Sequence, residues 1–493
     1  MLFNSHPYLA FLVVVAIGYS LIEKSIPSAK RPFLVVVSYA FYAWWRLDFL
    51  VLLLGSTIVN YCLGDWITKR VASGRKLHGL LQVGLVFNLG LIAIFKYQDL
   101  FVGTADDLFG LNYPIPHLFL PLAISFFTFE QISYLIDASR GHAPRYSVVE
   151  YALFVSYFPH LIAGPIVRHN DLIPQFRETR TPNQRSDDIS VGTTLFTIGL
   201  AKKTLIADNL APYTDTIFSA AQQGSHLGIS DAWLGTLFFG FQIYFDFSGY
   251  TDMALGSSCL FGIRLPFNFN SPYKASSAIE FWRRWHMSLS LFLKDYLYIP
   301  LGGNRRGHLR RYLNLLLTML LGGLWHGANW TFVLWGGLHG VYLTVNHLFR
   351  EAIGKGSLTP RPVFQSILHP FSVLLTFLAV SVAWVVFRAQ TVGGAIRVLQ
   401  GLVGFGHSHL VTFSPLAVVA LAAMFGIVWL APNSMEITWA FRPALSPERN
   451  YMPKSAGWLA WQPNIRNALL YAVLCIVGVL ALSNLSPFIY FQF

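Results

Sequence analysis

Residues 280–340 read EFWRRWHMSLSLFLKDYLYIPLGGNRRGHLRRYLNLLLTMLLGGLWHGANWTFVLWGGLHG. Apolar runs alternate here with histidines, two of which follow a tryptophan: His286 after Trp285 and His326 after Trp325. Ionisable groups are costly in hydrocarbon, so those within apolar runs usually have a function. The stretch also contains a third histidine and a basic run, made of His339 and of Arg305, Arg306, His308, Arg310 and Arg311.

The composition of the whole chain indicates a membrane protein. Of 493 residues, 54% are hydrophobic and 12% are charged, whereas soluble domains carry about 25% charged residues. The mean hydropathy is +0.50. We therefore predict an all-α polytopic membrane protein that forms a single integral-membrane domain over residues 1–493. Its parts are N-terminal helices in 1–115, a catalytic core in 116–350 and C-terminal helices in 351–493.

Apolar runs of about 20 residues predict the membrane-embedded segments, of which we expect about eleven to thirteen, including re-entrant ones. They lie at roughly 8–22, 32–46, 47–67, 77–96, 117–136, 150–167, 191–211, 232–262, 312–326, 329–349, 367–388, 413–431 and 466–486. The polar segment 169–190 is predicted to be a cytoplasmic loop. Residues 277–299 are predicted to form one interfacial helix that ends before Pro300.

The charges in the loops predict the orientation. The net charge of +12 is explained by Lys and Arg in short cytoplasmic loops, which favour an N-terminus on the opposite side of the membrane from the cytoplasm. We expect the lipid bilayer as a partner and no nucleic acid. The three cysteines, Cys62, Cys259 and Cys475, lie far apart in apolar surroundings. We expect them to be packing residues without disulfides.

His326 is the strongest candidate for a catalytic base. A helix that starts near Arg310 rises about 24 Å by this residue, past the middle of a bilayer core of about 30 Å. A neutral imidazole there can take a proton from a hydroxyl. His286 lies on the Trp/Leu face of its helix, where a packed histidine with one hydrogen bond is slightly favoured. His339 shares no face with His326 unless the chain turns near Gly327.

Several other polar residues lie in apolar surroundings. Asp246 and Asp252 could orient an imidazole, or could form buried pairs with Arg264, Arg283 or Arg284, and the sequence favours neither. Lys202 and Lys203 are expected to reach the interface, ahead of lining a polar entrance. No carboxylate or cysteine repeats at ligand spacing near the histidines, so no metal site is predicted.

Seven stretches carry a resemblance to a known family. They are PLAISFFTFEQISYLID at 121–137, FPHLIAGPIVR at 158–168, YFDFSGYTDMALG at 244–256, FNFNSPY at 267–273, FWRRWHMSLSLFLKDYLYIPLGGNR at 281–305, WHGANWTFVLWGGLHG at 325–340 and PFIYFQF at 487–493. With these motifs in this order, the chain resembles the membrane-bound O-acyltransferase (MBOAT) family, most closely its bacterial, AlgI-like alginate O-acetylation branch.

The resemblance implies a ring of tilted helices around a funnel or tunnel. It carries the family's catalytic histidine onto His326 and its second histidine onto His286. It implies acetyl-CoA or another acyl thioester as the donor substrate, with no permanently bound cofactor. It also implies periplasmic SGNH-type acetyltransferase partners that acetylate an exported polysaccharide, with alginate the first expectation. Candidate donor-binding residues are Trp325, Asn329, Arg283, Arg284, Arg305, Arg306, Asp246, Asp252 and His339, and His286 or Asn329 could also stabilise the oxyanion or position the thioester.

Other functions are weighed against this one. No Walker A loop, G-x-S-x-G elbow or H-E-x-x-H motif occurs, so a nucleotide-driven pump, a hydrolase and a zinc protease lose support. A transporter would be expected to show inverted repeats, and none is visible. A scaffold of an export complex also stays open. Within acyl transfer, bacterial cellulose, peptidoglycan and D-alanylated teichoic acid are the alternative acceptors.

Overall fold

The computed structural model describes residues 1–110, 118–162, 164–355, 362–407, 415–446, 456–484 and 488–489. Within these ranges the chain is helical, apart from loops and one isolated β-bridge between Pro266 and Leu445. The helices in the N-terminal half are α1 (His6–Ser25), α2 (Lys30–Ala43), α3 (Leu47–Ala72), α4 (Leu80–Ile92), α5 (Gln98–Phe109), α6 (Ile124–Ser139), α7 (Val148–Ser156), α8 (Phe158–Leu161), α9 (His169–Leu172), α10 (Pro182–Ala201), α11 (Asp208–Gln222) and α12 (Ile229–Cys259).

The helices in the C-terminal half are α13 (Ala278–Arg284), α14 (Met287–Leu293), α15 (His308–His326), α16 (Trp330–Lys355), α17 (Pro362–Arg388), α18 (Val392–Leu402), α19 (Pro415–Leu430), α20 (Ser434–Thr438) and α21 (Ile465–Leu480). Three π-helical segments continue α4, α10 and α14: η2 (Ala93–Tyr97), η4 (Lys202–Ala207) and η6 (Lys294–Tyr298). The all-α fold predicted from the sequence is confirmed.

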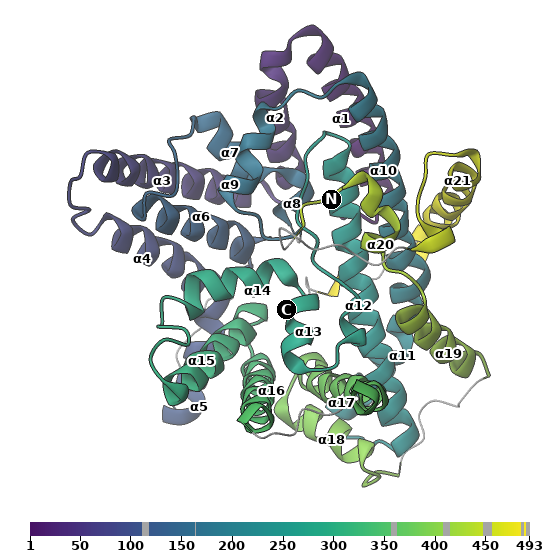
Figure 1. Ribbon diagram of the computed structural model, residues 1–493. Helices are drawn as coiled ribbons and strands as arrows, with labels where there is room; N and C mark the ends of the chain where they lie inside the picture. The colour runs from purple at the N-terminus through teal and green to yellow at the C-terminus, as the bar shows by residue number, and fades with distance from the viewer. Residues whose placement is uncertain are drawn as a thin grey trace.

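Helix α12 is the axis of the molecule (Figure 1). Nearly all of its residues are buried, including those from Phe238 to Cys259. It packs along α10 through small residues, because a Cβ on Gly249 would lie 2.7 Å from the carbonyl oxygen of Gly199. Glycines allow two helix backbones to approach closely in a membrane. Two groups of helices flank α12: α3, α4 and α6 on one side, and α13 to α17 below them in the view of Figure 1.

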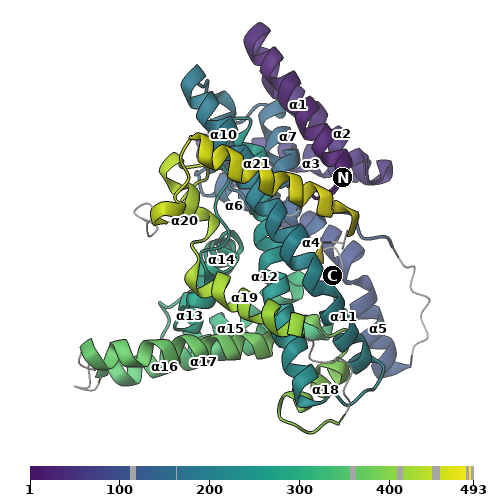
Figure 2. The same ribbon diagram turned by 90° about the vertical axis from the view of Figure 1, so that its right-hand side faces the viewer.

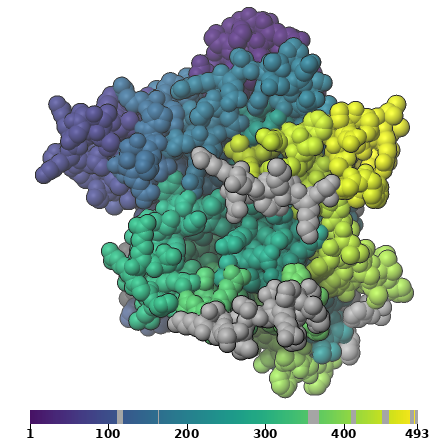
Figure 3. All heavy atoms as spheres, viewed as in Figure 1, coloured from purple at the N-terminus to yellow at the C-terminus, as the bar shows by residue number. Residues whose placement is uncertain are grey.

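Four described helical stretches are long and apolar enough to span a membrane: His6–Ser25, Leu47–Ala72, Leu80–Phe109 and Leu368–Arg388. The bent pair α19 and α20 would make a fifth. The long α10–α11 and α12 stand side by side, and α19 and α21 cross them at one edge (Figure 2). The space-filling view in Figure 3 shows the N-terminal helices above and the C-terminal half below and to the right. The chain is a multi-pass helical membrane protein.

Two predicted boundaries near the middle of the chain are wrong. The expected span at 150–167 stops at Ser156, because Tyr157 leaves the helical region and the short α8 begins a new direction with Pro159. The predicted loop at 169–190 contains the short α9, and the long helix α10 begins at Pro182. Thr181 and Gln184 form a capping box there, and such a box together with a proline in the first turn starts a helix even in polar sequence.

Candidate active site

His326 is the last residue of α15 and lies inside an aromatic cage. Gly327 is extended and turns the chain into α16, as the sequence suggested. The side chain is 4% exposed. Its ring packs edge-on against Trp325, Trp335 and Phe387, with ring centroids 4.9, 5.1 and 5.4 Å away. The cage buries the imidazole and restricts its orientation.

His286 lies at a break in the chain where one continuous helix was predicted over 277–299. Helix α13 ends at Arg284, and His286 has φ +42° before α14 begins at Met287. Positive φ is unfavourable for a residue with a Cβ and costs of order 1–3 kcal/mol. An extended segment stabilises the break: Asn270 N–H donates to the Arg284 carbonyl (2.9 Å), and Met287 N–H donates to the Asn268 carbonyl (3.0 Å). These contacts are long-range, so the local pattern could not reveal them.

The side chain of Asn268 determines which nitrogen of His286 carries hydrogen. Its Oδ1 accepts from the backbone N–H and the hydroxyl of Ser288, at 3.1 and 2.7 Å. Because a backbone N–H can only donate, the oxygen of the amide must face this site. His286 Nδ1 lies 3.3 Å from the same oxygen and therefore carries the hydrogen. Its Nε2 is then a hydrogen-bond acceptor, and no described residue bonds to this buried atom.

The two histidines of the tryptophan motifs face each other, with ring centroids 6.4 Å apart. His339 lies behind them. Trp335 separates it from His326, and Trp282 Nε1 donates to His339 Nδ1 at 3.2 Å. Among the residues that the structure describes, no three His, Cys, Asp or Glu side chains are grouped to hold a metal ion. The arrangement is a pair of neutral imidazoles suited to proton transfer.

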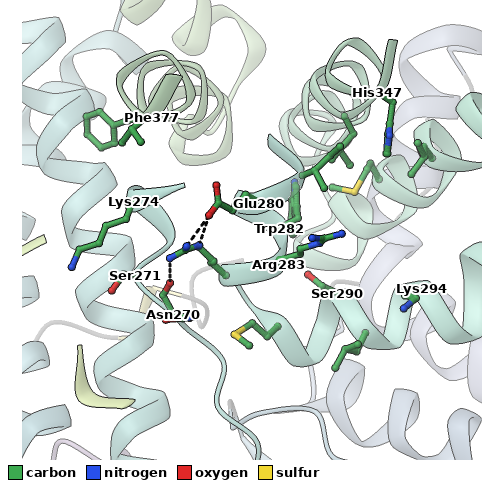
Figure 4. A pocket seen from close by; sticks show the side chains of 18 of the residues that line it. Asn270, Ser271, Lys274, Glu280, Trp282, Arg283, Ser290, Lys294, His347 and Phe377 are labelled. Carbon is green, nitrogen blue, oxygen red and sulfur yellow. Dashed lines mark hydrogen bonds and ion pairs between the residues drawn. The ribbon is translucent and has the colours of Figure 1, made fainter. Parts of the chain in front are cut away.

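A cavity of about 1660 Å³ lies next to the chain break at His286. It is formed by α13 to α17 and α19, and its wall includes Met287, the residue after His286, and Met319 of α15. Figure 4 shows Arg283, Ser290 and Lys294 along one side of it. Arg283 and Lys294 are exposed to the cavity and form no ion pair with a described residue. The cavity thus joins an apolar wall to two available positive charges.

The predicted basic residues separate into two groups. Arg283, Arg284 and Arg311 line the cavity, although Arg284 is paired with Glu280 (2.7 Å) and Arg311 with Glu351 (2.7 Å). Arg305 and Arg306, like Arg310, are exposed and are not part of its wall. Asn329 is also turned away from the histidines: its Nδ2 donates to the Gln390 carbonyl at 2.8 Å, and its Oδ1 accepts from Thr331 N–H.

Asp246 and Asp252 bind lysines, and neither of the two expected arrangements occurs. Asp246 Oδ1 lies 2.6 Å from Lys203 Nζ, and Asp252 Oδ2 lies 2.6 Å from Lys202 Nζ. Lys203 is fully buried and also contacts Asp208 at 2.7 Å. The expectation that both lysines reach the interface is therefore wrong for Lys203. The contact between η4 and α12 brings the charges together. The two backbones approach closely there because Gly199 and Gly249 have no side chains.

Sequence reasoning gave no role to four residues that bond to His286, to its partner Asn268 or to the end of α15. They are Asn268, Ser288, Lys96 and Tyr97. The signals were present: Asn268 stands in the FNFNSPY motif, and Lys96 is a charge at the end of a predicted span. Trp325 was predicted to contact the donor, and it packs with Phe126 and Phe129 of α6 at 5.3 and 5.5 Å.

The fold and the site define the class of protein. It is a helical, multi-pass membrane protein in which two buried histidines face each other beside a large cavity. The chain belongs to the MBOAT, membrane-bound O-acyltransferase, family, whose model matches residues 122–387. It is therefore an O-acyltransferase, and the resemblance seen in the motifs is confirmed. The matched region includes both His286 and His326.

Similar curated proteins have related activities. The chain is 39% identical to the probable alginate O-acetylase AlgI of Pseudomonas aeruginosa, over 100% of both chains. It is 42% identical to the peptidoglycan O-acetyltransferase of Helicobacter pylori, over 82% of this chain and 80% of the relative. It is 27% identical to the teichoic acid D-alanyltransferase of Bacillus subtilis, over 57% of this chain and 73% of the relative. A transporter or scaffold without chemistry loses its support.

Proposed function

We propose that this membrane O-acyltransferase takes acetyl from acetyl-CoA at the cytoplasmic face of the bacterial inner membrane. It passes the group across the membrane for O-acetylation of an exported polysaccharide, with alginate the first candidate. The observation that carries the proposal is the position of the cavity, whose wall includes Met287 beside His286. The relative that shares its full length with this chain is named as a probable alginate O-acetylase.

The donor enters through the cavity in this proposal. Arg283 and Lys294 bind its phosphates, since Arg offers a planar fork and Lys a compact charge. The apolar wall, which includes Leu291, Leu315 and Phe377, packs along the pantetheine arm. In this proposal the cavity opens on the cytoplasmic side and the N-terminus lies in the periplasm, the orientation that the loop charges favour.

The two imidazoles have different tasks. His326 removes the proton of the acceptor hydroxyl while the hydroxyl oxygen attacks the thioester carbonyl. The new C–O bond forms, the C–S bond breaks, and the proton passes to the departing sulfur, which leaves as free thiol. Neutral His286 has no hydrogen on Nε2, so it cannot donate to an oxyanion from that atom. It is suited to accept a hydrogen bond from an amide N–H of the donor and so to position the thioester.

The acetylated product leaves toward the periplasm. There, SGNH-type acetyltransferase partners would move acetyl to the sugar hydroxyls of the polymer. A second acceptor, peptidoglycan, is supported by the 42% identity to the Helicobacter pylori enzyme. The two candidates differ in the polymer that accepts acetyl and share the chemistry at His326.

A labelled-acetyl assay tests the proposal. Purified wild-type protein and the variants His326→Ala, His286→Ala and His142→Ala receive acetyl-labelled CoA, with a uronic-acid oligomer or a muropeptide as acceptor and a candidate partner protein. We expect thiol release from wild type and from His142→Ala, whose histidine is exposed and remote from the site. The His326→Ala variant is expected to release almost none. Equal activity of His326→Ala and wild type would overturn the assignment of His326 as the base. Label found only on the muropeptide would make peptidoglycan the acceptor in place of alginate.

A further inference from the structure

The last turn of α15 ends at His326, and its carbonyl groups are bonded by side chains from another part of the chain. Lys96 Nζ lies 2.6 Å from the Trp325 carbonyl oxygen and 3.4 Å from that of His326. The Tyr97 hydroxyl donates to the Leu324 carbonyl at 2.9 Å. Consecutive residues of η2 thus bind three consecutive carbonyls.

These contacts answer a specific physical need. The last four carbonyls of a helix have no partner within it, and they carry the negative end of the helix dipole. A glycine in the left-handed conformation often bonds such carbonyls, but Gly327 is extended here and makes no such cap. Unpaired carbonyls are expensive in a membrane-embedded interior. An ammonium group opposes the dipole and supplies several N–H donors at once.

The location of the lysine supports a functional role. Lys96 lies within the 30-residue apolar stretch Leu80–Phe109, where a charge needs a reason. It stands in a π-helical segment, and such segments often occur at functional sites. Its third contact is with Ser125 Oγ at 3.5 Å, and Nζ also stands 6.0 Å from the centre of the Trp325 ring. No carboxylate lies among these contacts, so the amino group serves the helix end.

We propose that Lys96, assisted by Tyr97, is a positioning residue for catalysis: it fixes the end of α15 and thereby the place of the His326 imidazole. Lys96 lies outside residues 122–387, the region that the family model matches. The N-terminal helices therefore contribute directly to the site. This inference rests on the proposed role of His326 as base.

The experiment compares Lys96→Met, Lys96→Arg and Tyr97→Phe with wild type in the labelled-acetyl assay. Displacement of a catalytic group by about 1 Å can cost about 100-fold in rate. We expect Lys96→Met to lower kcat about 10- to 100-fold with KM nearly unchanged, because the cavity is untouched. Lys96→Arg, which keeps the charge and the donors, should restore most of kcat, and Tyr97→Phe should cause a smaller loss. Lys69→Met is the matched control, because the partly exposed Lys69 forms its one described ion pair with Asp65.

A second measurement does not depend on turnover. Hydrogen exchange resolved to peptides covering 320–328 should accelerate in Lys96→Met and return toward wild type in Lys96→Arg. Unchanged kcat in a folded Lys96→Met protein, or a loss confined to KM, would overturn the inference. So would unchanged exchange at the end of α15. His326→Ala, measured in parallel, separates the role of His326 from that of Lys96. If that variant is active, His326 is not the base. Hydrogen exchange still reports whether Lys96 fixes the end of α15.

Discussion

Two of the clusters of ionisable side chains in the interior of the bundle differ in how completely they are paired. In the lysine cluster, Lys203 lies between Asp208 and Asp246, and the second oxygen of Asp246 accepts from Ile489 N–H at 3.0 Å. In the histidine cluster, His286 uses one nitrogen, and no described residue bonds to the other. The first cluster is built to hold helices and the C-terminal segment. The second keeps a polar atom available for a substrate.

This difference predicts that the two clusters respond to substitution in opposite ways. His326→Ala should cost activity and little stability. A positioned general base contributes about 10²–10⁴-fold to rate, so we expect a loss of this size in thiol release. Thermal unfolding in detergent should change little, because the aromatic cage can close on the small residue. A large stability loss with proportional activity loss would remove the distinction between the clusters.

Lys203→Met should give the reverse result. It leaves two buried carboxylates without their cation, and breaking a buried ion pair costs about 3–5 kcal/mol. We expect a lower midpoint of unfolding and a lower yield, with kcat per folded molecule close to wild type. Lys69→Met, which removes a partly exposed pair with Asp65, should cost less than about 1 kcal/mol. Loss of kcat in the folded fraction would instead show that Lys203 acts on the chemistry.

Asn268→Ala tests whether the hydrogen on His286 Nδ1 is set by its neighbour. We expect kcat to fall about 10- to 100-fold, the range seen when outer hydrogen-bond partners of a functional histidine are removed. Asn268→Asp keeps an acceptor for both His286 and Ser288 and should recover part of the loss. If the Asp variant is no better than the Ala variant, the amide acts through packing and not through the imidazole.

Arg283→Gln and Lys294→Gln probe the cavity, where charges face solvent. Each should raise KM for acetyl-CoA by about tenfold and leave kcat nearly unchanged, which is the result expected when binding is lost equally in ground and transition states. Added salt should raise the KM of the wild type toward that of the variants, because exposed charges are screened. Arg306→Gln, outside the cavity wall, is the comparison. A similar rise in KM in Arg306→Gln would show that the donor phosphates bind outside the cavity.

The smallest effect is expected at an ion pair near the surface. Hydrogen bonds from Arg177, and further ones from Ser147, lower the pKa of Glu150 to about 2. Arg31 also contacts this carboxylate at 2.9 Å. Glu150 lies in the first turn of the nine-residue α7, outside the helices long enough to span a membrane. Because the folded pKa is below the unfolded value of about 4.3, this contribution is complete above pH 5 and is lost as pH falls toward 2. Glu150→Gln should therefore lower the unfolding midpoint at pH 7, change it little near pH 2 and flatten the acid limb of the midpoint profile.

The positions of most helices could be predicted from the sequence, because hydropathy and period are local properties. The apolar runs near 47–67, 191–211 and 312–326 became parts of α3, α10 and α15. The errors lie where distant segments override a local preference. At His286 the extended segment 268–270 breaks a helix that the pattern favours. Lys203 is buried because η4 meets two aspartates.

The sequence by itself determined the class of protein and its family and singled out the two histidines that the structure brings face to face, since apolar length and short motifs are local properties of the chain. Only the tertiary structure decided what each polar group meets. It paired Asp246 with a lysine, set the hydrogen on His286 through Asn268, and brought Lys96 to the end of α15. The reason is physical: a buried charge or imidazole must find its partner within about 3 Å, and which partner is near depends on how helices far apart in the chain approach each other.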